Sequence, residues 1–166
     1  MESCASVASR ARSAIKPRVP LRGLRWLVPA LGLALVFRHW VWMPVLLVGA
    51  SMEPTLRNGQ WAGVNKLAYR FRAPQRGDIV LVNTGSELTA KRILGLPREE
   101  LALRGGALYV NGQPLTEPYV RRPSGDNIAA GQLGTNRFLV IGDNRQDTTV
   151  AVVKRERIVG PLIFWR

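Results

Sequence analysis

The chain has 166 residues and one cysteine, and its 24 lysines and arginines against 11 aspartates and glutamates give a net charge of +13. This length suits one domain with its own core plus a tethering segment. The lone cysteine, Cys4, excludes an intramolecular disulfide. The charge alone would attract nucleic acid, anionic lipid or an acidic partner, so its distribution matters more than its size.

Residues 1–22 are rich in serine, alanine and arginine, and no acidic residue follows Glu2. The stretch shows no sustained hydrophobic periodicity. We therefore expect a basic, disordered tail.

Residues 23–42 read as a membrane anchor. Leu24 to Phe37 is an apolar run, which Arg38-His39 interrupts before a second one begins at Trp40. A spanning helix needs about 20 apolar residues, so Arg25 and Arg38 would have to extend toward opposite headgroup layers. The basic tail then predicts a single-pass protein of the plasma (or inner) membrane, in contact with the lipid bilayer, with its N-terminus cytoplasmic and the remainder extracytoplasmic.

Two other readings of this segment remain open. A cleaved signal peptide would also have a basic start and a short apolar core, but its candidate cleavage site, Val48-Gly49-Ala50, lies far beyond that core. A buried helix of a soluble domain is disfavoured by the basic flank.

Residues 43–166 predict a mostly β domain of short antiparallel strands with no long helix. Asn111-Gly112 is a strong two-residue hairpin signal, and Arg76-Gly77-Asp78 is typical of a turn. Pro118 to Thr135 is expected to be a surface loop or a small irregular insert. The predicted strands are Val45–Val48, Gln60–Asn65, Asp78–Asn83, Leu88–Ile93, Ala107–Val110, Phe138–Ile141 and Ile158–Phe164.

Several kinds of chemistry are disfavoured by the residues present. The single histidine, His39, lies at the predicted membrane boundary, so a Ser-His-Asp triad is not expected. No cysteine or histidine cluster has metal-ligand spacing and the carboxylates are scattered, so we expect neither metal nor cofactor. Gly105-Gly106 lacks the residues of a phosphate-binding loop.

A serine and a lysine remain as candidates. Ser51 follows Gly49-Ala50 and precedes Pro54, so the backbone can turn sharply there, although a plain turn or helix-cap role would explain the same pattern. Lys91 lies in an apolar stretch, where burial would lower the pKa of its amine and let it act as a base. The alternatives, Lys66 and Lys154, lie in more polar surroundings.

The order of motifs resembles the type I signal peptidase family, which uses a Ser–Lys dyad. The motifs are Ser51-Met52-Glu53-Pro54-Thr55-Leu56, Arg76-Gly77-Asp78-Ile79-Val80, Lys91-Arg92-Ile93 with Gly95-Leu96-Pro97, Asn111-Gly112, and Gly142-Asp143-Asn144-Arg145. The resemblance implies a signal-peptidase-like β fold behind one N-terminal transmembrane helix. It also implies a membrane-bound serine endopeptidase that removes signal peptides from exported preproteins, without nucleic acid as a partner.

The resemblance also assigns roles to residues. Ser51 would be the nucleophile and its amide part of the oxyanion hole, Lys91 the general base, and Thr148 the hydroxyl that orients the lysine. Substrate would add as a strand beside Asp78–Val82 or the segment before Ser51. The implied substrate-binding residues are Met52, Leu56, Asp78, Ile79, Leu88, Thr89 and Ala90, and the structural residues near the site are Gly49, Pro54, Gly142, Asp143 and Asn144.

The last motif departs from the family pattern. An acid and an arginine that normally support the site are replaced by Val150 and Val152. Losing both partners leaves no single charge unpaired, so apolar packing can take the place of the ion pair.

Three alternatives follow from these observations. The chain could be a pilin-processing peptidase of a conjugation system with the same chemistry, or an inactive membrane protein that binds exported segments without cutting them. A self-cleaving repressor shares the dyad, but the sequence has no helix-turn-helix pattern for binding DNA.

Overall fold

The computed structural model describes residues 24–85 and 87–163. The chain divides after Val36 into two compact units, which are described separately. The basic tail predicted for residues 1–22 lies outside the described residues.

Helix α1 (Leu24–Val41) contains Pro29 and no acidic residue in its first turn. Its apolar side chains are exposed between Trp26 (77%) and Val36 (56%). Among the residues that the structure describes, no helix is both long and apolar enough to cross a membrane.

The second unit contains a seven-stranded antiparallel sheet with the strand order β1-β2-β11-β3-β4-β9-β10. The central strand, β3, has the sequence Ile-Val-Leu-Val-Asn and is buried at its first four positions, as expected for a strand covered on both faces. The strands are β1 (Trp42–Leu46), β2 (Trp61–Asn65), β3 (Ile79–Asn83), β4 (Leu88–Gly95), β9 (Arg137–Ile141), β10 (Ala151–Lys154) and β11 (Ile158–Ile163).

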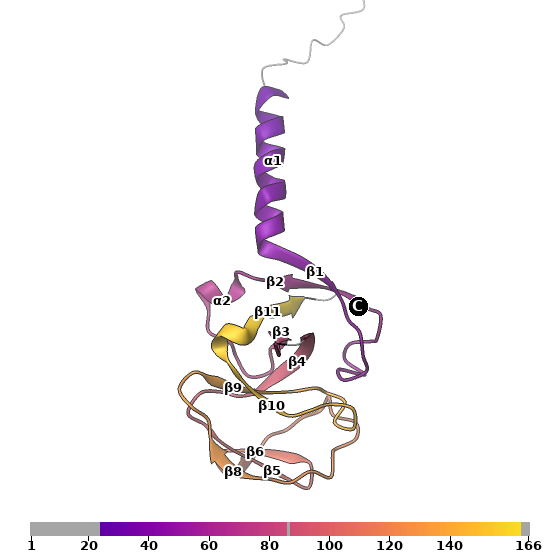
Figure 1. Ribbon diagram of the computed structural model, residues 1–166, viewed down its shortest axis with the longest axis vertical. Coiled ribbons are helices and arrows are strands. Elements are labelled where there is room, and N and C mark those ends of the chain that lie inside the picture. Colours follow the sequence, from indigo (N-terminus) through magenta and orange to yellow (C-terminus); the bar gives the residue numbers. More distant parts are fainter. Residues whose placement is uncertain (1–23, 86, 164–166) are drawn as a thin grey trace, which may run out of the picture. The chain divides into compact units, whose positions relative to one another are not determined.

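A four-stranded sheet with the order β7-β6-β5-β8 lies at the end of this unit away from β1 and β2 (Figure 1). Its β6–β7 hairpin turns at Asn111 and Gly112, whose φ angles of 50° and 78° are the left-handed values that such a turn requires. The strands are β5 (Glu100–Arg104), β6 (Ala107–Val110), β7 (Gln113–Pro114) and β8 (Ile128–Gln132).

The core of the second unit consists of three clusters of aliphatic side chains. One joins the Ser51 turn to β2 and β3 through Met52, Leu56 and Val64. A second lies among β3, β4, β9 and β11, and the third joins the two sheets through Leu94, Leu103 and Ile141. The two sheets are therefore held together by aliphatic side chains, one of which, Leu94, belongs to strand β4.

Most of the fold prediction is confirmed. Each predicted strand corresponds to an observed one, and between residues 43 and 163 the described helices are only short α2 (Ala68–Phe71) and η1 (Arg155–Arg157). The prediction of a loop or irregular insert over Pro118–Thr135 is wrong in part, because β8 lies within it and pairs with β5. Every residue of β8 is exposed and its sequence is Ile-Ala-Ala-Gly-Gln, so pairing with β5 rather than local propensity makes it a strand.

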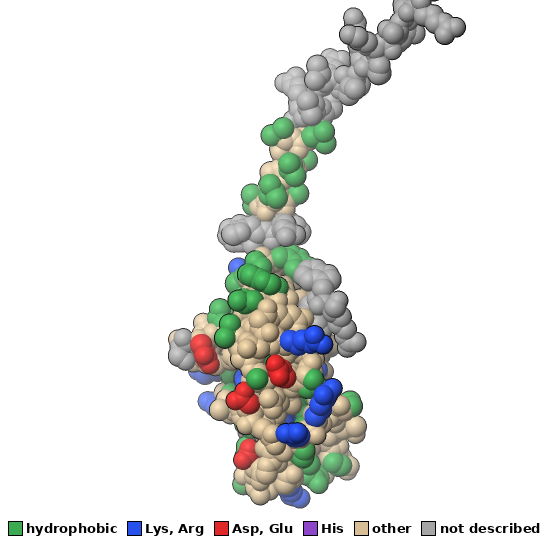
Figure 2. All heavy atoms as spheres, turned by 90° about the vertical axis from the view of Figure 1, so that its right-hand side faces the viewer, with side chains coloured by type: hydrophobic (Ala, Val, Ile, Leu, Met, Phe, Trp, Pro, Cys, Tyr) green, Lys and Arg blue, Asp and Glu red, His purple; other side chains and the backbone are tan. Residues whose placement is uncertain are grey.

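The positive charge of the sequence does not gather into a separate patch on the face that Figure 2 presents. Acidic and basic side chains lie among one another there. This face therefore gives no indication of a nucleic-acid site, which would place basic side chains together.

Candidate active site

Lys91 lies in β4 opposite Val80 of β3, and only 7% of its surface is exposed. Its Nζ donates a hydrogen bond to Thr148 Oγ1 at 2.7 Å. Burial lowers the pKa of Lys91, while the carboxylates of Glu87 and Asp147 act in the opposite direction. The amine is thus held in one place and is easier to keep neutral than an exposed lysine.

Thr148 fixes the amine relative to the loop that follows β9. Its Oγ1 also accepts a hydrogen bond from the Gly142 amide at 3.0 Å. A hydroxyl oxygen has two acceptor sites, so Gly142 and Lys91 together use both. Thr148 therefore fixes the position of the Lys91 amine relative to the backbone of Gly142.

Gly142 brings Ser51 into the same group. A Cβ at Gly142 would lie 2.2 Å from the Ser51 carbonyl oxygen and 2.5 Å from Thr148 Oγ1, so no other residue fits there without displacement. The Ser51 carbonyl also accepts a hydrogen bond from the Asn144 amide at 3.0 Å, and the Asn144 side chain donates to Ala50 O at 3.1 Å. The turn that carries Ser51 and the hydroxyl that holds Lys91 therefore meet at one glycine.

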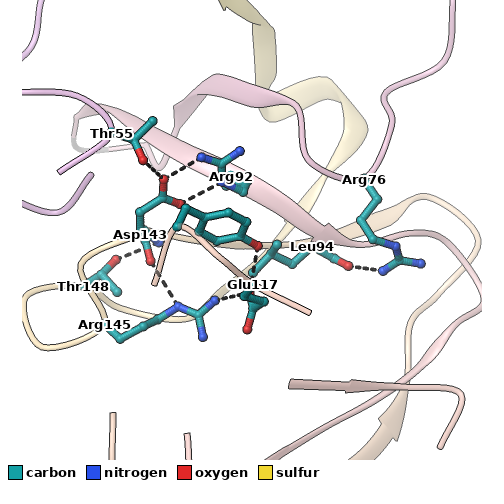
Figure 3. Close-up of polar contacts among 10 residues, drawn as sticks. Thr55, Arg76, Arg92, Leu94, Glu117, Asp143, Arg145 and Thr148 are labelled. Atoms are coloured by element: carbon teal, nitrogen blue, oxygen red, sulfur yellow. Dashed lines mark hydrogen bonds and ion pairs between the residues drawn. The ribbon is translucent and has the colours of Figure 1, made fainter. Parts of the chain in front are cut away.

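Asp143 joins the same loop to the serine turn and to β4. It is 2% exposed and accepts hydrogen bonds from Thr55 Oγ1 at 2.5 Å, Arg92 Nε at 2.8 Å and Arg92 Nη2 at 2.6 Å (Figure 3). These partners are side chains far away in sequence, so the Asp143 carboxylate connects segments that are distant along the chain.

A cavity of about 210 Å³ opens beside Ser51. It is bounded by the segment that leads into the serine turn and by the start of β4. Five of the substrate-binding residues predicted from the resemblance line it, namely Met52, Leu56, Leu88, Thr89 and Ala90, and Gly49 does so too.

Asp78 and Ile79 are not among the residues that line this cavity. Asp78 instead accepts hydrogen bonds from the Gln75 amide at 3.0 Å, Tyr69 Oη at 2.8 Å and Arg72 Nη1 at 2.7 Å, which closes the turn before β3. Strand β3 itself lies between β4 and β11. The prediction that substrate adds as a strand beside Asp78–Val82 is therefore wrong, because both edges of that strand are already paired.

Gly49 and Pro54 shape the serine turn. Gly49 has a φ of +105°, which residues with a side chain rarely adopt, and its amide donates to Asn58 Oδ1 at 3.0 Å. Pro54 follows a cis peptide bond.

Three polar residues near the site were missed as contributors, namely Thr55, Glu117 and Tyr119. Thr55 binds Asp143, Glu117 forms an ion pair with Arg145, and the ring of Tyr119 lies 4.0 Å from the Arg92 guanidinium. The partner of Glu117 is 28 positions away, which no local pattern reveals.

Val150 and Val152 differ in their surroundings. Val150 packs against the cluster that contains Leu94 and Ile141, while Val152 is 47% exposed. Within the described part of the chain, no group of three or more histidine, cysteine or acidic residues could hold a metal ion.

Comparison with known proteins places this arrangement in a family. The family model described as signal peptidase, peptidase S26, matches residues 21–165. The chain belongs to this family. It is 32% identical over 158 residues to signal peptidase I of Bacillus amyloliquefaciens, covering 83% of this chain and 80% of that protein.

A second relative agrees with this assignment. The chain is 34% identical to the probable signal peptidase I-2 of Synechocystis sp., with 84% of this chain and 70% of that protein covered. A crystal structure of signal peptidase I from Enterococcus faecalis V583 aligns with a TM-score of 0.46 and 26% identity, over 55% of this chain and 98% of that one. As a member of the signal peptidase family, the protein is a serine endopeptidase.

Proposed function

We propose that the protein cleaves signal peptides from exported preproteins with Ser51 as nucleophile and Lys91 as general base. The observation that carries this proposal is the buried Lys91 amine, 2.7 Å from Thr148 Oγ1, beside a glycine that touches both Thr148 and the Ser51 carbonyl. A buried, oriented amine next to a serine turn is the arrangement that this chemistry needs.

The reaction follows from these groups. Lys91 Nζ takes the proton of Ser51 Oγ as that oxygen bonds to the carbonyl carbon of the scissile peptide. Lys91 then returns the proton to the leaving amine as the carbon–nitrogen bond breaks, which leaves an acyl group on Ser51. Lys91 next takes a proton from a water molecule as that oxygen bonds to the ester carbon, and returns the proton to Ser51 Oγ as the ester bond breaks, which releases the new carboxyl end and restores the serine. The Ser51 amide would stabilise the oxyanion in both acylation and deacylation.

The cavity beside Ser51 supports a substrate with small residues before the cleaved bond. The cavity has a volume of about 210 Å³ and is lined by aliphatic and small side chains, including Ala90 and Leu56. In the described residues, β4 pairs with β9 only from Arg92 onward, so Leu88–Lys91 has one edge without a strand. An extended peptide can add along that edge and place alternate side chains in the cavity.

The location proposed for the enzyme is the membrane, with α1 as the point of attachment. The exposed apolar side chains of α1, among them Trp26, Leu31 and Leu35, support this proposal. The excess of lysine and arginine before α1 supports an orientation with the N-terminus in the cytoplasm and the catalytic unit outside. Alkaline extraction and protease protection of vesicles distinguish a spanning helix from a peripheral one.

The experiment is cleavage of a preprotein with alanine at the first and third positions before the bond, by the full chain in detergent. Wild type and Lys66→Ala should cleave, because Lys66 lies outside the site, whereas Ser51→Ala and Lys91→Ala should not. Cleavage by Ser51→Ala would contradict the proposal. Binding of the preprotein without cleavage by well-folded wild type would instead support the inactive binder.

A further inference from the structure

The segment after β7 connects the four-stranded sheet to the site through Glu117. Glu117 Oε1 accepts hydrogen bonds from Tyr119 Oη at 2.8 Å and from Arg145 Nη2. The side chains of Arg145 and Glu117 are only 2% and 8% exposed. Each of the two charges therefore depends on the other, because neither is well hydrated.

Arg145 passes this restraint to the loop that holds the lysine. Its Nε donates to the Gly142 carbonyl at 3.2 Å, and the amide of the same glycine donates to Thr148 Oγ1 at 3.0 Å. Thr148 in turn accepts from Lys91 Nζ. The Glu117 carboxylate is thus linked through Arg145 and Gly142 to Thr148 (Figure 3), and Thr148 binds the Lys91 amine.

Tyr119 makes a second contact from the same segment. Its ring lies 4.0 Å from the Arg92 guanidinium, and Arg92 forms the ion pair with Asp143. Glu117 and Tyr119 therefore touch both arginines that bind the loop Gly142–Arg145, and that loop also binds the backbone of Ser51 through Asn144.

We propose that Glu117 is a positioning residue for the reaction, which acts through Arg145 and Gly142 to hold Thr148 and Lys91 in register with Ser51. The inference rests on the proposed Ser–Lys function. It assigns to the insert between β7 and β8 a part in setting the geometry of the dyad.

The test variant is Glu117→Gln, which keeps the shape and an acceptor oxygen but removes the charge. Arg145 Nη1 already lacks a hydrogen-bond partner, so losing the carboxylate leaves a buried cation without its counterion. We expect the loop to shift and kcat to fall roughly 10- to 100-fold, as small displacements of reacting groups do. KM should change little, because Glu117 and Arg145 are not among the residues that line the cavity beside Ser51.

The pH profile separates positioning from a direct charge effect. The charged groups around Lys91 are the carboxylates of Glu87 and Asp147 and the neighbouring Arg92. If the loop loosens and water reaches the amine, the pKa of Lys91 rises and the acid limb of kcat/KM moves to higher pH. Removing a negative charge without movement would lower that pKa and move the limb to lower pH.

The control is Glu99→Gln, because Glu99 also forms an ion pair with an arginine, Arg76, at 2.5 Å, outside the loop and with more of both side chains exposed. The expected result is a lower kcat and a raised acid limb for Glu117→Gln alone, while both variants lose some thermal stability. An unchanged limb with a stability loss like that of the control would overturn the inference, and so would a limb displaced to lower pH. Retained cleavage by Lys91→Ala would instead show that the proposed function itself had failed.

Discussion

The two ends of the segment that runs from Gly142 to Val152 are stabilised by different kinds of contact. At its start, Asp143 and Arg145 are buried charges, and each is matched by an opposite charge, from Arg92 and Glu117. At its end, Val150 and Val152 line a cavity of about 440 Å³ whose other walls are mostly aliphatic. Side-chain hydrogen bonds and ion pairs therefore fix the end that contacts the serine and the lysine, whereas the other end is held by apolar packing and by the pairing of β10 with β9.

The comparison explains why the departure from the family pattern is compatible with this fold. Replacing both members of a buried ion pair by apolar residues is often neutral or stabilising, whereas removing one member is costly. Val150 packs among leucine and isoleucine side chains, so apolar contacts occupy the position of the replaced acid. The ion pairs Arg92–Asp143 and Arg145–Glu117 lie at the start of the segment, which contacts the turn that carries Ser51.

The largest effect is expected from Asp143→Ala, which breaks the polar end. Arg92 would lose both of its bonds to the carboxylate and Thr55 would lose its acceptor. Breaking a buried pair from one side costs about 3–5 kcal/mol, and thermal or denaturant unfolding of the full chain in detergent measures this loss. A loss below about 1 kcal/mol would show that these charges are well hydrated, and would contradict the conclusion that buried ion pairs fix this end of the segment.

The second variant, Val150→Asp, places a charge at the apolar end. We expect a loss of about 2–3 kcal/mol, because the aliphatic cavity offers the carboxylate few partners. Unfolding midpoints compared with those of Val150→Asn separate the cost of charge from that of polarity.

Adding Val152→Arg to Val150→Asp sharpens this test. Val152 is 47% exposed, so an arginine there can reach both water and the new aspartate. The double variant should recover at least half of the lost stability. A double variant less stable than the single one would mean that this end cannot accommodate an ion pair at all.

A smaller effect on stability is expected from Thr148→Val, which conserves shape. The Gly142 amide and Lys91 Nζ would both lose their acceptor, at a cost of about 1–2 kcal/mol. The same change should reduce kcat by roughly 100-fold, because the amine is no longer oriented. Thr148→Ser keeps the hydroxyl and is the control, so equal rates for the two variants would remove Thr148 from the mechanism.

Sequence patterns predicted the parts of this molecule that depend on local chemistry. Runs of β-branched and aliphatic residues located β3 and β4, and Asn111-Gly112 located the hairpin, because strand propensity and left-handed turns are properties of neighbouring residues. The exposed strand β8 was missed, since alanine and glycine carry little strand signal.

The same limit applies to the site. Ser51 and Lys91 were singled out by their motifs, and the structure supplies the contacts of Thr148 with Lys91 and Gly142. The pairing of Glu117 with Arg145 depends on how the two sheets fold against each other. A contact between residues so far apart produces no local pattern in a single sequence, so it can be identified only in the folded structure.

The smallest effect is expected from Glu87→Gln and Asp147→Asn. Both carboxylates raise the pKa of Lys91 and so oppose the lowering by burial. Removing either should lower that pKa and shift the acid limb of kcat/KM to lower pH, and the shift should be small because both groups are exposed. The shift should shrink in high salt, which screens exposed charges, while the large effects of Asp143→Ala should persist because that carboxylate is buried. A limb that moves to higher pH, or a shift insensitive to salt, would mean that these acids influence Lys91 through structure rather than through charge.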